Sequence, residues 1–257
     1  MLGAFLGWLA FLLSPTYRRR FLANASQAGY RFSEVRRAVA EAGKLVLEIP
    51  RLWFGRASRV SWEGAEHVEA ARATGRGVLL LTPHLGCFEI TAQAYAERFG
   101  PVTVLYRPPR KPWLRDLVAT ARARPNLSTA ATTLAGVRQM LRVLKAGGAI
   151  GLLPDQVPPQ GLGVWSPFFG RPAYTMTLPG RLVQQTAATL LLIWGERLPC
   201  GRGYRVRVLP WQGELPTGPE AAAAQVNAQM ERLVRAGPGQ YLWGYARYKQ
   251  PRQELAP

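Results

Sequence analysis

The feature that most restricts the fold is the alternation of short apolar segments with longer amphipathic ones. Five segments have the length and composition of buried strands, at 77–83, 101–106, 148–154, 189–195 and 204–210. Apolar residues at helical spacing occupy the stretches at 89–99, 112–124, 132–146 and about 179–188. Strands that are apolar on both faces and alternate with helices are typical of a parallel sheet covered on both sides. The sequence therefore predicts an α/β layered fold with a largely parallel central sheet flanked by helices.

Two helical segments precede these strands. The chain opens with thirteen apolar residues, followed shortly by Arg18–Arg20. A helix of that length measures about 20 Å, less than the roughly 30 Å of a bilayer core. The charge follows the apolar run and no small-residue cleavage site is evident, which argues against a signal peptide. We expect residues 1–16 to be a hydrophobic, membrane-associated segment and residues 17–257 to form a single domain. An amphipathic helix should follow and end near Pro50 and Gly55.

The charge of the chain points to an anionic partner. The formal net charge is +18, with 33 basic and 15 acidic residues, and most of the basic residues are arginines. Planar guanidinium groups suit phosphate and carboxylate, although a GC-rich genome would also favour arginine. Codon bias does not explain the scarcity of acids. A membrane lipid or a nucleic acid would satisfy this charge.

Polar residues follow three of the apolar segments, at the point where each segment ends. His84 follows the first, Arg107 the second and Asp155 the third. Sites in open α/β sheets are built at the carboxyl edge of the strands. Three residues of complementary chemistry at that edge indicate a site.

His84 and Glu89 are five positions apart, which on a helix corresponds to about 140°, so they would not share a helical face. His84 should therefore lie in a turn, with Glu89 on the helix that follows. The carboxylate would then accept one imidazole N–H and fix the tautomer, leaving the other nitrogen as a base. A lone histidine making a local hydrogen bond is the alternative that composition alone leaves open.

Four motifs of the sequence, taken together and in order, resemble those of one enzyme family. "HLGCFE" is similar to the His-x4-Asp/Glu motif of glycerolipid acyltransferases. It is followed in order by "LYRPPRKPWLRDLVATARARPN", "LLPDQVPPQGLGVWSPFFGRPAYT" and "GPGQYLWGYARYK". From about residue 15 to 250 the chain resembles the late acyltransferases of lipid A biosynthesis, the lauroyl/myristoyl transferase family.

That resemblance implies a glycerolipid acyltransferase-like fold with an N-terminal hydrophobic helix, on the cytoplasmic face of a bacterial inner membrane. It also implies transfer of a fatty acyl chain from acyl carrier protein to a hydroxyl of a lipid A precursor. His84 and Glu89 take the catalytic dyad positions, and Arg107 and Asp155 match other polar site residues of the family. Arg122 and Arg124 match family arginines and would hold acceptor phosphates, unless they form a solvated basic face. No cofactor or metal is implied.

Other interpretations remain open at this stage. Another lipid acceptor, such as an aminolipid or glycolipid, or coenzyme A as the donor carrier, fits the same motifs. Nucleic-acid binding is not expected, because no recognition helix or interleaving of aromatic and basic residues is found. The long segment from Pro154 to Pro172 should be a loop, whose aromatic residues Trp165, Phe168 and Phe169 either line an acyl groove or pack under the loop. Cys87 should be a small packing residue and no nucleophile.

Overall fold

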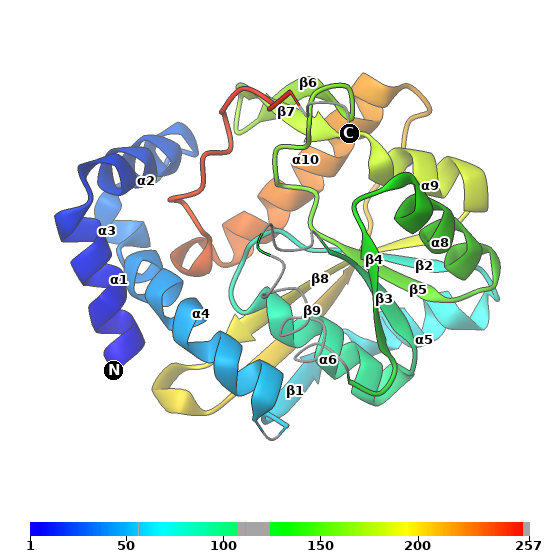
Figure 1. Cartoon of the computed structure of the whole chain (residues 1–257), viewed down its shortest axis with the longest axis horizontal. Coiled ribbons are helices and arrows are strands. Elements are labelled where there is room, and N and C mark those ends of the chain that lie inside the picture. The colour runs from blue at the N-terminus through cyan, green and yellow to red at the C-terminus, as the bar shows by residue number, and fades with distance from the viewer. Residues whose placement is uncertain (56, 107–110, 112–123, 254–257) are drawn as a thin grey trace.

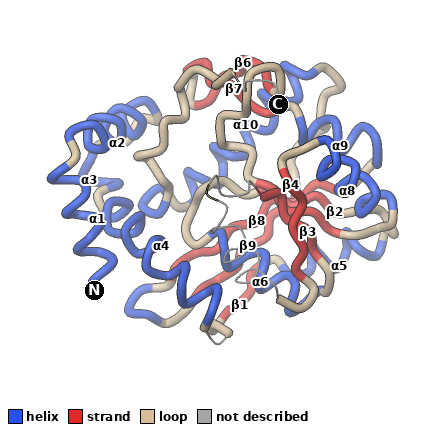
Figure 2. Tube along the Cα trace, in the orientation of Figure 1, coloured by secondary structure: helices blue, strands red, loops and turns tan. Residues whose placement is uncertain are grey.

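A seven-stranded sheet forms the centre of the molecule, as a computed structural model shows (Figures 1 and 2). The structure describes residues 1–55, 57–106, 111 and 124–253. The strand order is β1-β9-β8-β2-β5-β3-β4, and each pair of neighbours is parallel except β8 and β9. The strands are β1 (Val60–Glu63), β2 (Val78–Leu81), β3 (Val102–Tyr106), β4 (Leu127–Ala131), β5 (Ala149–Leu152), β8 (Thr189–Arg197) and β9 (Tyr204–Pro210). The predicted α/β fold with a largely parallel sheet is confirmed.

Helices cover both faces of the sheet, because the central strands are apolar on both sides. On β2, Leu79 and Leu81 belong to one buried cluster, while Val78 and Leu80 belong to the other. The first cluster is completed by α8 (Leu134–Lys145), α9 (Leu178–Thr186) and α10 (Pro219–Ala236). The second is completed by α5 (Ala65–Ala73) and α6 (Phe88–Phe99). The continuous apolar runs of the sequence are thus explained by burial on two faces.

The N-terminal region is helical and packs against the rest of the chain (Figure 1). It comprises α1 (Leu2–Leu13), α2 (Pro15–Gln27), α3 (Phe32–Val35) and α4 (Arg37–Phe54). Phe11 of α1 is buried and stacks on Phe32 with ring centroids 5.4 Å apart. The hydrophobic segment predicted at residues 1–16 therefore shares a core with residues beyond 17. Within the described part of the chain, no helix combines the length and the apolar character needed to cross a bilayer.

The amphipathic helix expected to end near Pro50 and Gly55 is α4, which continues through Pro50 to Phe54 and has Gly55 as its C-cap. One expectation about local structure was wrong. The segment from Pro154 to Pro172 is not a plain loop, because it contains β6 (Gly163–Phe168) and the start of β7 (Arg171–Met176), which form an antiparallel hairpin. The helix expected at 112–124 falls almost entirely outside the described residues. Sequence reasoning gave no expectation for β1, β4 or α10.

Candidate active site

His84 and Asp155 are brought together by the register of two neighbouring parallel strands. Leu81 at the end of β2 pairs with Leu152 at the end of β5, and each polar residue lies three positions further along. The imidazole Nδ1 of His84 lies 2.7 Å from Oδ1 of Asp155. The backbone N–H of His84 donates to Oδ2 of the same carboxylate at 2.9 Å. The histidine ring and its backbone are thus both fixed by a single side chain.

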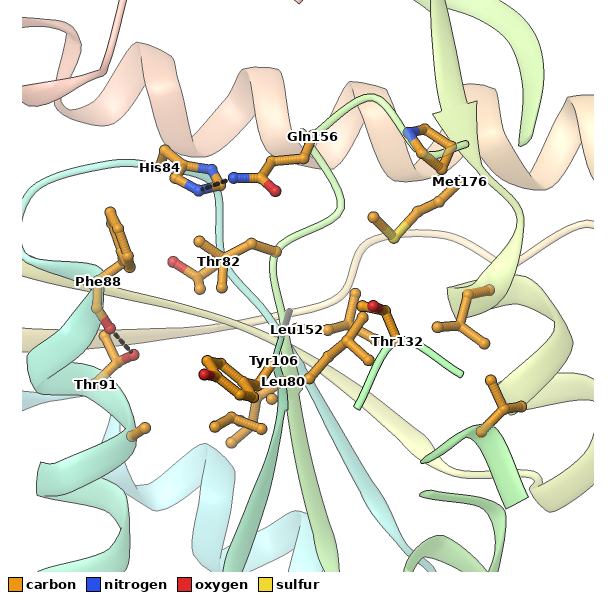
Figure 3. Close-up of a pocket in the computed structure, with 18 of the residues that line it drawn as sticks. Leu80, Thr82, His84, Phe88, Thr91, Tyr106, Thr132, Leu152, Gln156 and Met176 are labelled. Atoms are coloured by element: carbon orange, nitrogen blue, oxygen red, sulfur yellow. Dashed lines mark hydrogen bonds between the residues drawn. The ribbon is translucent and has the colours of Figure 1, made fainter. Parts of the chain in front are cut away.

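These contacts determine which ring nitrogen is free to act as a base. Nδ1 carries the proton, because it faces an aspartate oxygen that can only accept a hydrogen bond. Nε2 is left with a lone pair, and the amide nitrogen of Gln156 lies 2.8 Å from it (Figure 3). The ring of Tyr245 stacks over the imidazole, with a centroid separation of 6.2 Å and an angle of 11°. The side chain of His84 is 13% exposed, so Nε2 remains accessible from the cavity described below.

Asp155 remains ionised although it is buried. Burial by itself would raise its pKa, but the charge and hydrogen bonds of His84 and the nearby charge of Arg247 together lower it. The hydroxyl of Tyr241 adds a third contact, at 3.4 Å from Oδ2. Burial and the adjacent carboxylate raise the pKa of Tyr241 well above its ordinary value, so this hydroxyl stays protonated and donates. Tyr241 is itself buried, so the "QYLW" segment packs in the core and contacts Asp155 through this hydroxyl.

The expected contact between Glu89 and the imidazole is not the one observed. Both ring nitrogens have partners, and these are Asp155 and Gln156. Glu89 lies in the first turn of α6, and its Oε2 accepts a hydrogen bond from the indole N–H of Trp53 at 3.3 Å. Asp155 thus takes the orienting position that the sequence analysis gave to Glu89. The reason is that a parallel sheet aligns two strand ends, whereas the turn directs the start of α6 toward α4.

The turn between β2 and α6 has a shape that depends on Gly86. This residue has a φ of +60°, and a Cβ there would overlap the backbone carbonyl oxygen of Gly195. The Cys87 N–H donates to the same carbonyl at 2.8 Å. Cys87 itself is fully buried, and burial raises the pKa of its thiol to about 12. The prediction that Cys87 is a packing residue and no nucleophile agrees with this environment.

An apolar cavity of about 650 Å³ lies beside His84 (Figure 3). Glu89 and Gln156 line it together with the histidine. Its other walls are mostly hydrophobic and include Leu80, Val104, Tyr106, Val137, Leu152, Met176 and Leu178. These residues come from β2, β3, β5, β7, α8 and α9. The cavity therefore joins the histidine to a space suited to an aliphatic chain.

Of the three arginines predicted to bind substrate, the structure describes only Arg124, since Arg107 and Arg122 lie outside the described residues. The guanidinium of Arg124 donates to the backbone carbonyls of Leu52, Trp53 and Gly55. It thereby satisfies carbonyl groups at the C-terminal end of α4 that have no partner within the helix. Neither alternative of the sequence analysis anticipated this role. A phosphate contact by Arg124 remains a prediction.

The aromatic residues of the β6–β7 hairpin mainly serve packing. Phe168 and Phe169 are buried in the main core, whereas Trp165 is 44% exposed, and none of the three lines the cavity among the described residues.

Sequence reasoning missed Gln156 and Tyr245 as neighbours of His84. The equal distance of His84 and Asp155 from their strand ends was a usable signal for their pairing. Nowhere in the described ranges do three or more His, Cys, Asp or Glu side chains gather to hold a metal ion.

Comparison with known proteins places the chain in a family. The family model described as bacterial lipid A biosynthesis acyltransferase matches residues 5–250. The chain belongs to this family. It is therefore an acyltransferase, as the resemblance implied.

Curated relatives of this acyltransferase support the same conclusion. A lipid A biosynthesis lauroyltransferase of Escherichia coli K12 is 29% identical over 80% of this chain and 69% of its own length. A lipid A biosynthesis palmitoleoyltransferase of the same strain is 26% identical over 80% of this chain and 68% of its own length. A lipid A biosynthesis myristoyltransferase is 25% identical over 93% of this chain and 77% of its own length.

Proposed function

We propose that the chain transfers a fatty acyl group from an acyl thioester, carried by acyl carrier protein, to a hydroxyl of a lipid A precursor. The observation that carries this proposal is a histidine with a fixed tautomer, whose Nε2 lies at an apolar cavity of about 650 Å³. Membership of the lipid A acyltransferase family supports the choice of acceptor. The carrier protein is proposed from the family resemblance alone.

In the proposed mechanism, His84 acts as the general base. The acceptor hydroxyl displaces the Gln156 amide at Nε2 and gives its proton to that nitrogen as its oxygen attacks the thioester carbonyl. The carbon–sulfur bond then breaks, and the departing sulfur takes the proton back from the imidazolium. No covalent acyl-enzyme is formed, in keeping with the raised pKa of the buried Cys87 thiol.

Asp155 and Glu89 have separate proposed roles. Asp155 holds the productive tautomer and favours the imidazolium that forms during the transfer. Glu89, the second residue of the His84–Glu89 dyad, lines the cavity next to the base and adds a second negative charge on that side. Arg107, Arg122 and Arg124 are proposed to contact the anionic groups of the acceptor.

The cavity is proposed to take the acyl chain. The relatives are named for lauroyl, palmitoleoyl and myristoyl transfer, and all three groups are long and apolar. Leucine, valine and methionine side chains along the cavity would remove such a chain from water. We further propose that the enzyme works at the cytoplasmic face of a bacterial inner membrane, where acyl thioester and lipid precursor meet.

A reconstituted reaction tests the proposal. Purified enzyme in detergent micelles is given a lipid A precursor with either an acyl carrier protein thioester or a coenzyme A thioester, and products are identified by mass spectrometry. The expected product is the precursor gaining one acyl group from the carrier protein donor. His84→Ala should lower the rate by about 10²–10⁴-fold while leaving the circular dichroism spectrum unchanged. Product formation by His84→Ala at the wild-type rate would refute the role of His84, and acylation only of other lipids would refute the acceptor.

A further inference from the structure

Helices α1 and α4 together present an apolar surface for which the described part of the chain provides no cover. On α1, Leu2, Phe5, Leu6, Leu9, Leu12 and Leu13 are exposed, with exposed fractions from 36% to 72%. On α4, Val46, Leu47 and Phe54 are exposed as well. We call this set of nine residues the α1–α4 face. Exposed apolar side chains in one contiguous patch mark an interaction surface.

The α1–α4 face is a fixed part of the structure, because the two helices pack closely. Gly3 of α1 lies against Lys44 of α4, and Gly7 lies against Val39, so the helices are antiparallel (Figure 1). Gly43 lies between both glycines of α1. The first turns of α1 are therefore next to Val46 and Leu47, and Phe54 continues the surface two turns along α4. Glycine at these contacts permits close approach of the two backbones, and α1 turns its leucines outward.

The charge around this face selects an anionic partner. Arg19 and Arg20, on the helix that follows α1, and Arg51, on α4 itself, are exposed. The acidic side chains of residues 1–55 are otherwise engaged: Glu41 and Glu48 bind the buried Arg197, and Glu34 accepts from the backbone N–H of Arg31 at 2.7 Å. Leucine and phenylalanine bordered by arginine are typical of helices that lie in the interface of an anionic bilayer.

We propose that the α1–α4 face seats the enzyme in the plane of one leaflet of an anionic membrane. In this arrangement α1 lies along the surface and is no separate anchor, because α4 contributes Val46, Leu47 and Phe54 to the same contact. The choice of a bilayer over a protein rests on the proposed lipid acceptor. The C-terminal end of α4 supports this choice, because Trp53 next to Phe54 donates to Glu89 at the cavity. The face thus ends at the active site, where a lipid would leave the membrane.

Vesicle flotation tests the proposal without requiring activity. Full-length protein is mixed with vesicles of phosphatidylglycerol and phosphatidylethanolamine, or of phosphatidylcholine, and the bound fraction is measured. Val46→Glu places a charge on α4, outside the N-terminal apolar segment, at a side chain that is 63% exposed. We expect the partition coefficient of this variant for the anionic vesicles to fall about tenfold or more, since one valine can no longer be buried in the lipid. Wild-type binding should be weaker to phosphatidylcholine.

Ala221→Glu is the matched control. It introduces the same charge in the first turn of α10, where a carboxylate is tolerated, at an exposed position far from α1 (Figure 1). This control should bind vesicles like the wild type, and both variants should keep their turnover in detergent micelles. Equal flotation of Val46→Glu and Ala221→Glu would overturn the proposal, leaving acyl transfer untouched. So would a lipid-free dimer that Val46→Glu converts to a monomer, because the face would then join two copies of the chain.

Discussion

Replacement of Asp155 by asparagine tests whether the carboxylate orients the His84 ring, because it changes the hydrogen bonds and keeps the volume of the side chain. The two side chains are nearly the same size, but one carboxylate oxygen becomes an amide nitrogen that donates. In the native site Oδ1 accepts from the His84 ring at 2.7 Å and Oδ2 from the His84 backbone at 2.9 Å. The asparagine can accept at only one of these two positions.

The His84 backbone N–H sets the orientation of the asparagine amide, because this N–H can only donate a hydrogen bond. If the amide nitrogen faced the His84 backbone N–H, two donors would meet in a buried site, at a cost of about 1–3 kcal/mol. The oxygen therefore stays with the backbone, and the amide nitrogen faces Nδ1. Nδ1 must then accept, so the ring proton moves to Nε2 and the base is lost. We expect Asp155→Asn to lower the turnover number by about 10²–10⁴-fold, the range for removal of a general base.

The assay is the rate of acyl transfer in mixed micelles as a function of pH, with Glu231→Gln as the control. Glu231 also accepts a backbone hydrogen bond, from Phe169 at 2.6 Å, but lies on α10 away from the cavity. The control should retain wild-type turnover. Turnover of Asp155→Asn within threefold of the wild type, with the same pH profile, would refute the assignment of Asp155 as the orienting group.

Acid unfolding gives an independent readout of the same substitution. The pKa of Asp155 is lowered in the folded state from an ordinary value of 3.8, so the ionised carboxylate contributes stability above that pH. This contribution is lost as the pH falls through the lower, folded-state value. The difference in unfolding free energy between the wild type and Asp155→Asn should therefore be constant near neutral pH and shrink below about pH 4. A difference independent of pH down to complete acid unfolding would contradict this account.

Three further substitutions test other parts of the molecule. Glu89→Gln removes a charge at the cavity and should lower turnover at least about tenfold, equivalent to about 1.4 kcal/mol, measured in micelles; an unchanged rate would exclude an electrostatic role for Glu89. Gly43→Ala would place a Cβ against backbone atoms of Gly3 and Gly7, and overpacking of this kind costs about 1–3 kcal/mol. Its melting temperature should drop by several degrees, while Gly239→Ala, whose Cβ would meet Arg37 at an ordinary 3.6 Å, should melt close to the wild type. Met176 lies across the cavity from His84, so Met176→Trp should shift the products toward shorter acyl chains in mass spectra when donors of several lengths compete (Figure 3).

The central sheet could be predicted because each of its inner strands is apolar on both faces. All five predicted strands are present, and Leu79 and Val78 show why, since they enter opposite cores. The hairpin of β6 and β7 could not be predicted in the same way. Its prolines, glycines and exposed Trp165 are typical of a loop, and the strands form because they pair with each other over α10.

The positions of His84 and Asp155 in the sheet could be predicted from sequence, but the contact between them could not. His84 and Asp155 were placed at the carboxyl edge of the sheet from sequence, which the structure confirms. Their direct pairing depends on β2 and β5 being neighbours, and strand order is not encoded in any local pattern. The capping of α4 by Arg124 is equally inaccessible from sequence, because it joins segments some seventy residues apart.

A buried arginine connects the α1–α4 face to the turn that follows His84. Arg197, near the end of β8, binds Glu48 through two nitrogens at 2.7 Å and Glu41 at 2.6 Å, and its third contact is the carbonyl of Gly86 at 3.5 Å. Burial alone would lower the pKa of Arg197, but the two carboxylates raise it, so the ion pair stays charged. A buried ion pair of this kind adds little net stability compared with an apolar core, but separation of its partners would leave a buried charge unpaired. Because Glu41 and Glu48 lie on α4 and Gly86 lies two residues after His84, the arginine holds α4 in place relative to His84. The orientation of the enzyme on a membrane would then determine how an acceptor hydroxyl approaches Nε2.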